Sequence, residues 1–63
     1  MANILVTDFG DDCENVMIFT DNPKYTVETV EEMLSKKGAT FNEIYEVPEK
    51  DLGYYLYEPL HLK

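Results

Sequence analysis

The chain has 63 residues, with 13 acidic and 5 basic side chains and a net charge of −8, so it has room for one small domain, residues 1–63. All five bases are lysines, and a chain so acidic and without arginine is expected to repel DNA and RNA and to be attracted to basic protein surfaces. One cysteine and one histidine exclude a disulfide within the chain and a structural zinc site built from one chain.

The first predicted element is a β-hairpin. Residues 2–9, ANILVTDF, form an apolar and β-branched run of strand length, and residues 15–20, NVMIFT, form a second. Between them lies GDDC, whose glycine and aspartates favour tight turns. Two such runs around a short turn indicate a hairpin.

The second strand of this hairpin is apolar on both faces. Side chains alternate along a strand, so Val16, Ile18 and Thr20 share one face. Met17 and Phe19 share the other face. A single helix covers one face of a small sheet. The second face is then left partly bare, where a partner can reach it, unless Met17 and Phe19 form a second core face that the rest of the chain covers.

An α-helix is predicted for the segment TVETVEEMLSKKG, residues 26–38. Thr26 is the expected N-cap and Gly38 the expected C-cap. Four apolar residues recur at helical spacing and form the stripe that faces the core. They are Val27, Val30, Met33 and Leu34.

The C-terminal third predicts one strand and a short further element. Residues 40–47, TFNEIYEV, resemble a strand that ends at Pro48, and EKDLG at 49–53 is typical of a turn. Residues 54–60, YYLYEPL, are expected to form a short edge strand or an extended tail, because proline restricts a strand to a sheet edge. The predicted fold class is α+β. A hairpin and one or two further strands form a small antiparallel or mixed sheet, with the helix packed on one face.

The acidic segment DFGDDCE, residues 8–14, raises the question of a metal or catalytic site. Its spacing does not match a calcium-binding loop, which needs alternating oxygen ligands, a central glycine and a late glutamate. The chain has no glycine-rich phosphate loop, and no nucleophile is patterned near His61. We therefore predict no catalytic residue, no metal ligand and no cofactor, and we do not expect an enzyme.

Four tyrosines crowd the C-terminal third: Tyr45, Tyr54, Tyr55 and Tyr57. One interpretation is that they cap a thin core and the edge of the sheet, which tyrosine does well. The other is that they form an interaction surface, since tyrosine is enriched at binding hot spots. Under the second interpretation this edge is a candidate homodimer contact.

The acids around the hairpin suggest a binding surface. An apolar patch inside a negative ring would suit a protein that normally binds DNA, because it meets both phosphate-binding donors and a protruding apolar wedge. The alternative is a solvated acidic turn that only keeps the chain soluble. The expected partner-binding residues are Asp8, Asp11, Asp12, Glu14, Met17, Phe19 and Asp21.

Residues 4–25 resemble the central hairpin of the phage uracil-DNA glycosylase inhibitors. The similar features are ILV, Thr7, an acidic turn, ENVM, and then Thr20, Asp21, Pro23 and Tyr25. Those inhibitors are small acidic proteins that imitate DNA and block a host repair enzyme. The resemblance implies that Met17 and Phe19 line a pocket for the leucine that the glycosylase pushes into the minor groove, with Asp21 as a peripheral acid. In that family further strands follow the hairpin, whereas here a helix is predicted.

Together these features predict a small acidic inhibitor that mimics DNA and occludes a host DNA-binding protein with a basic cleft. Uracil-DNA glycosylase is the first target to consider. Inhibition of a CRISPR nuclease or an RNA polymerase is an alternative, and so is a plain acidic interaction module without mimicry. No direct binding of nucleic acid is expected.

The sequence also predicts where the protein works. No apolar run reaches the ~18 residues that a membrane span needs, so no membrane association is expected. The first residues, MANILVTD, lack the basic and small-residue features of a signal peptide. An unpaired cysteine fits a reducing compartment, so we expect the cytoplasm, that of a bacterial host if the protein is phage-encoded.

Overall fold

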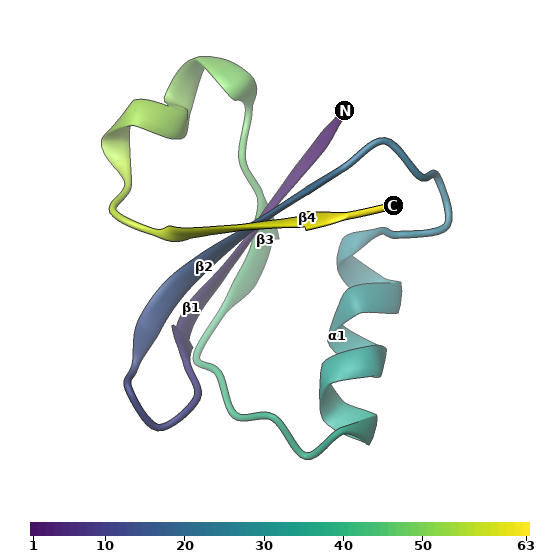
Figure 1. The fold of residues 1–63 in the computed structure, drawn as a ribbon, viewed down its shortest axis with the longest axis vertical. Coiled ribbons are helices and arrows are strands. Elements are labelled where there is room, and N and C mark those ends of the chain that lie inside the picture. Colours follow the sequence, from purple (N-terminus) through teal and green to yellow (C-terminus); the bar gives the residue numbers. More distant parts are fainter.

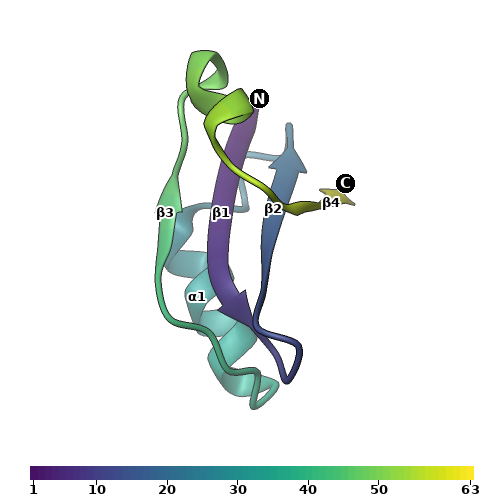
Figure 2. The ribbon, with the colours of Figure 1, turned by 90° about the vertical axis from the view of Figure 1, so that its left-hand side faces the viewer.

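The structure, a computed structural model, describes residues 1–63 as one mixed four-stranded sheet with one α-helix and one 3₁₀-helix. The elements follow the order β1 (Ala2–Phe9), β2 (Glu14–Thr20), α1 (Val27–Lys36), β3 (Ile44–Glu46), η1 (Glu49–Tyr54) and β4 (Glu58–Leu62). The strand order in the sheet is β3-β1-β2-β4 (Figures 1 and 2). The predicted α+β fold class is confirmed. Neither helix has the length and apolar character needed to cross a membrane.

Two long connections cross the sheet, one on each face. β1 pairs antiparallel with β2 and with β3, whereas β4 pairs parallel with β2. The chain therefore passes from β2 over β1 to β3, and α1 makes this crossing. It then returns from the β3 edge to the opposite edge, where β4 lies, and η1 is part of that crossing (Figure 2).

On one face of the sheet, α1 covers the larger core cluster. The buried members are Ile4, Val6, Ile18, Val30 and Leu34. The helix begins as predicted, because the Thr26 side chain accepts a hydrogen bond from the backbone N–H of Thr29 at 3.2 Å and the Thr29 side chain accepts one from the backbone N–H of Thr26 at 2.8 Å. The C-cap is Lys37 rather than the predicted Gly38, which follows it with a φ of 73°, the left-handed conformation that glycine adopts without strain.

On the other face, a second core cluster lies beneath the return crossing. Its buried members are Leu5, Met17 and Val47, and the residues packed against them include Leu52, Tyr55 and Tyr57. The prediction that this face is left partly bare is wrong, and the alternative that Met17 and Phe19 belong to a second core face is confirmed. The apolar side chains of the return crossing cover this face. Their packing against Met17 removes apolar surface from water that the hairpin alone would expose.

The later elements differ from the sequence prediction in position. β3 spans three residues rather than eight, although Asn42 N still donates to Thr7 O at 2.8 Å beside it. The segment EKDLG, predicted as a turn, is most of the 3₁₀-helix η1. β4 lies at Glu58–Leu62 instead of 54–60, because the tyrosine segment is used to cross the sheet before the chain can pair with β2.

Candidate partner-binding site

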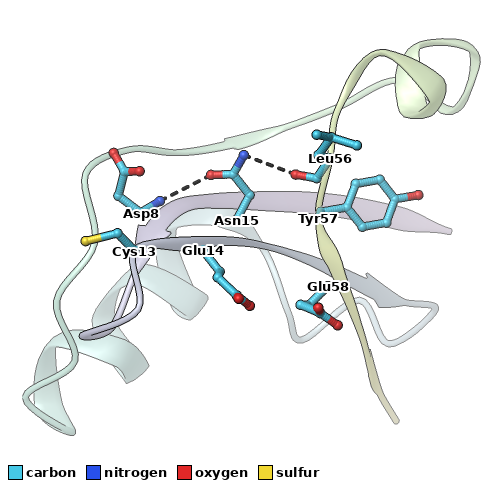
Figure 3. A pocket seen from close by; sticks show the side chains of 7 residues that line it. All are labelled: Asp8, Cys13, Glu14, Asn15, Leu56, Tyr57 and Glu58. Atoms are coloured by element: carbon cyan, nitrogen blue, oxygen red, sulfur yellow. Dashed lines mark hydrogen bonds between the residues drawn. The ribbon is translucent and has the colours of Figure 1, made fainter.

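A hollow of about 430 Å³ lies where the hairpin meets the start of β4. Its lining comprises three acids, one cysteine and one amide from the hairpin and the C-terminal segment, together with one leucine and one tyrosine. The residues of this acidic hollow are Asp8, Cys13, Glu14, Asn15, Leu56, Tyr57 and Glu58 (Figure 3). No basic residue lines it.

A β-bulge shapes the hairpin side of the acidic hollow. The regular pairing of β1 and β2 breaks after Val6 opposite Val16 and resumes with Phe9 opposite Glu14. Two residues of β1 therefore face the single residue Asn15. Asp8, the second of the two, has a φ of 51°. Bulges of this kind redirect side chains, here the carboxylate at the edge of the hollow.

Asn15 ties the bulge to the C-terminal segment. Its Oδ1 accepts a hydrogen bond from Asp8 N at 3.3 Å, and its Nδ2 donates to Leu56 O at 3.1 Å (Figure 3). One amide side chain thus satisfies a donor left free by the bulge and an acceptor on a segment 41 residues further along the chain. The two walls of the hollow are held at a fixed separation as a result.

The carboxylates of the hairpin end have no cationic partner within the molecule. Its two salt bridges lie elsewhere, between the N-terminal ammonium and Asp21 at 3.7 Å and between Lys36 and Glu32 at 3.1 Å. The hairpin acids Asp11 and Asp12 are exposed in the turn beside the hollow. Their charge and that of the hollow are balanced only by solvent ions, so this end projects a negative field.

Two large side chains near the start of β4 are strongly exposed, and one of them lies beside these acids. Leu56 lines the hollow and is 90% exposed, although its carbonyl is fixed by Asn15. Tyr54, at the end of η1, is 83% exposed. Exposed leucines are common when isolated, but this one lies on the rim of an acidic surface where an apolar contact would be combined with charge.

The predicted site residues fall into three groups. Asp8, Asp11, Asp12 and Glu14 lie together at the hairpin turn. Asp21 does not join them, because it follows the far end of β2, which spans seven residues or about 23 Å. There it pairs with the N-terminus instead.

The two apolar residues predicted to receive a partner are covered by the chain itself. Met17 is completely buried, so it cannot accept a side chain from another protein without displacing the crossing segment. Phe19 is half-buried, stacked on His61 with ring centroids 5.3 Å apart and edge-on to Tyr57 at 5.9 Å. The leucine pocket implied by the resemblance is absent at Met17 because Leu52, Tyr55 and Tyr57 fill that position.

The tyrosines divide between the two roles considered. Tyr45, Tyr55 and Tyr57 pack against the second core cluster, whereas Tyr54 is free. The Tyr45 and Tyr55 rings meet edge-on with centroids 6.5 Å apart. Burial raises the pKa of the Tyr45 phenol above its usual value of 10.0, and the side-chain hydrogen bond with Tyr55 acts in the same direction.

Sequence analysis missed Leu56, Glu58 and Asn15 as parts of the site. The exposure of Leu56 could have been predicted from the alternation in YLY, residues 55–57. Side chains alternate in an extended segment, so two tyrosines that face the core place the leucine between them toward solvent. The role of Asn15 had no such signal, since it depends on a contact 41 residues away.

No group of three or more His, Cys, Asp or Glu side chains is arranged to hold a metal ion. Comparison with known protein families, curated proteins and solved structures finds no match for this chain.

Proposed function

We propose that the protein is a small acidic inhibitor whose hairpin end enters the basic cleft of a DNA-binding protein and occupies the positions of DNA phosphates. The observation that carries this proposal is the acidic hollow: acids from two distant segments converge there without any base, beside a protruding leucine. A net charge of −8 adds long-range attraction to such a cleft.

The mechanism is occlusion in two steps. Exposed carboxylates first steer the encounter, because charge complementarity accelerates association with a basic surface. Asp8 and Glu58 then accept hydrogen bonds from the lysine and arginine side chains that otherwise bind phosphate. Since Asn15 joins the backbone of Asp8 to that of Leu56, the backbone on both walls of the hollow needs no rearrangement on binding.

The apolar part of the contact is Leu56 rather than Met17 and Phe19. A side chain that is 90% exposed on the rim can bury most of its surface in a partner, which makes it a candidate anchor. The geometry is therefore a protruding wedge on this protein and a receiving pocket on the target.

Uracil-DNA glycosylase is the first target to test, supported by the resemblance of residues 4–25 to its phage inhibitors. A CRISPR nuclease or an RNA polymerase offers the same kind of basic cleft and is the alternative within this class. A plain acidic interaction module would use Leu56 and Tyr54, both strongly exposed, without replacing DNA. For the inhibitor, the place of action is the bacterial cytoplasm.

The test is inhibition of uracil-DNA glycosylase on a uracil-containing oligonucleotide. We expect inhibition at stoichiometric concentration that is competitive with DNA. Leu56→Ala should speed dissociation by about tenfold, as the loss of one anchor does. Leu60→Ala, in β4, removes another exposed leucine and is the matched control that should behave like wild type.

Absence of inhibition at stoichiometric concentration would show that the named target is wrong. Partners are then sought by capture from a bacterial lysate and tested for competition with DNA. A partner whose binding is indifferent to DNA would contradict mimicry and favour the plain interaction module.

A further inference from the structure

A second hollow, of about 490 Å³, lies along α1 and the turn that precedes it. It contains three of the five lysines of this acidic chain. The residues of this lysine groove are Lys24, Tyr25, Thr29, Glu32, Met33, Lys36 and Lys37. Their spacing of three to four residues places the helical members along one side of α1.

The floor of the lysine groove is apolar and held in place. Tyr25 and Met33 are both half-buried, and both pack against the larger core cluster beneath α1. Packing against the core therefore restricts the positions of these two side chains. An aromatic ring and a thioether together favour contact with an aromatic ligand.

Two cations remain available at the ends of this floor. Lys36 is paired with Glu32 at 3.1 Å, whereas Lys24 and Lys37 form no salt bridge. Lys24 precedes α1 and Lys37 caps its C-terminus, so the whole ten-residue helix, about 15 Å long, lies between them. An elongated apolar strip thus has a positive charge near each end.

The Lys24 end is anchored to the first turn of the helix. Lys24 N donates to Asn22 Oδ1 at 2.9 Å, and Thr29 Oγ1 donates to Lys24 O at 2.9 Å. Tyr25 N donates to Asn22 O at 3.0 Å in the same turn. These hydrogen bonds order the backbone at this end of the groove in the absence of a ligand.

We infer that the lysine groove binds a small organic anion with an aromatic body. The body lies on Tyr25 and Met33 while the anionic group reaches Lys24 or Lys37. A polyanion such as a nucleic acid is excluded because its many charges meet a molecule of net charge −8. A ligand with one charge experiences mainly the nearby lysines, since the more distant acids are screened at physiological salt. This inference is independent of the proposed inhibition.

The probe for this site is 8-anilinonaphthalene-1-sulfonate, an aromatic anion whose fluorescence rises in apolar surroundings. We compare wild type with the double variant Lys24→Gln and Lys37→Gln. The matched control is Lys50→Gln and Lys63→Gln, which removes the same charge outside the groove. The groove variant should bind about fivefold more weakly, because the sulfonate loses its one lysine contact at whichever end it lies, while the control should stay within about twofold of wild type.

Amide chemical-shift mapping with the same probe locates the site. The expected perturbations are at Tyr25, Thr29 and Met33. Equal weakening in both double variants would mean that only overall charge matters and would overturn the inference. It would also be overturned by perturbations centred on Tyr54 and Leu56, the exposed apolar residues of the other face.

Discussion

Asn15 is the single side chain that joins the acidic turn to the C-terminal segment. Its two hydrogen bonds, at 3.3 and 3.1 Å, connect Asp8 and Leu56, residues that lie on opposite walls of the hollow. Each such bond contributes about 1 kcal/mol net when partly exposed to solvent. The arrangement of the two walls therefore depends on the Asn15 side chain, whose oxygen accepts one hydrogen bond and whose nitrogen donates the other.

Asn15→Asp separates those two functions. The carboxylate can still accept from Asp8 N, but it cannot donate to Leu56 O and instead places a negative charge against that carbonyl. We expect the free energy of unfolding to fall by about 1–3 kcal/mol, measured by urea denaturation. Asn42→Ala, at an exposed asparagine whose side chain makes no hydrogen bond, should stay within about 0.5 kcal/mol of wild type. Equal effects of the two substitutions would contradict the role given to Asn15.

Tyr45 gives the molecule a predicted alkaline sensitivity. Its pKa is raised above 10.0 by burial first and then by Tyr55 and the nearby charge of Glu43. Because the Tyr45 pKa is higher in the folded than in the unfolded protein, the neutral phenol stabilises the fold. This stabilisation is fully present below about pH 10 and is lost as pH rises through the folded-state pKa. We expect the tyrosine absorbance to continue rising above about pH 10 during alkaline titration, and this late part of the rise to shrink in Tyr45→Phe.

The matched variant is Tyr45→Phe. Its urea midpoint should fall less steeply with pH above about 10 than that of wild type, because the group with the raised pKa is gone. Identical alkaline slopes for the two proteins would show that Tyr45 is not responsible.

Among the elements, the hairpin and α1 were predictable because their signals are local. Turn residues flank the β1–β2 connection, Thr26 caps α1, and Val30 and Leu34 face the core. η1 and β4 were misplaced because tertiary structure overrides local preference there. YYLY has strong strand propensity, yet these residues cross the sheet because β3 and β4 lie at opposite edges.

The candidate site was predictable to the same degree. Asp8, Asp11 and Asp12 were recognisable because turn acids are exposed in almost any fold. The separation of Asp21 follows from strand length and could have been deduced from the sequence. The burial of Met17 was one of two alternatives that the sequence left open, because it depends on which distant segment covers the second face.

Substitution of Met17 tests the covered face. In a bare face, Met17→Ala would have little effect on stability. Because Met17 is completely buried under Leu52, Tyr55 and Tyr57, we expect a loss of about 2–5 kcal/mol. Leu34→Ala, beneath α1, should cost a similar amount.

A domain this small can fail to fold after such a loss, so a milder variant is included. Met17→Leu conserves volume and should cost less than about 1.5 kcal/mol, with the fold intact by circular dichroism. Glu31→Ala, on the exposed side of α1, is the control and should change little. A Met17→Ala midpoint close to that of Glu31→Ala would contradict the second core cluster.

Over the whole molecule, charge is distributed unevenly. The acidic hollow contains no base, whereas three of the five lysines line the groove along α1. Despite these lysines, the net charge of −8 should prevent binding of nucleic acid. Fluorescence anisotropy with duplex and single-stranded probes at moderate salt should show no binding. Micromolar affinity that weakens with added salt would contradict the interpretation of this protein as a phosphate mimic.

The central claim is that the location of the acids, rather than their number, produces binding. Two triple variants with equal net charge separate these effects. One carries the changes Asp8→Asn, Asp11→Asn and Asp12→Asn at the hairpin, where asparagine keeps the turn geometry. The other carries Glu31→Gln, Glu46→Gln and Glu49→Gln, at exposed acids outside salt bridges and outside the acidic hollow.

The decisive measurement is the association rate of each variant with the partner, uracil-DNA glycosylase or the protein captured in its place, over a range of salt concentrations. The hairpin variant should associate about tenfold more slowly than wild type at low salt, with a flatter salt dependence, because steering charge is lost at the contact. The control variant should remain close to wild type. If both variants associate at the same rate, or if the hairpin variant binds as fast and as tightly as wild type, the acidic hairpin is only a solvated turn.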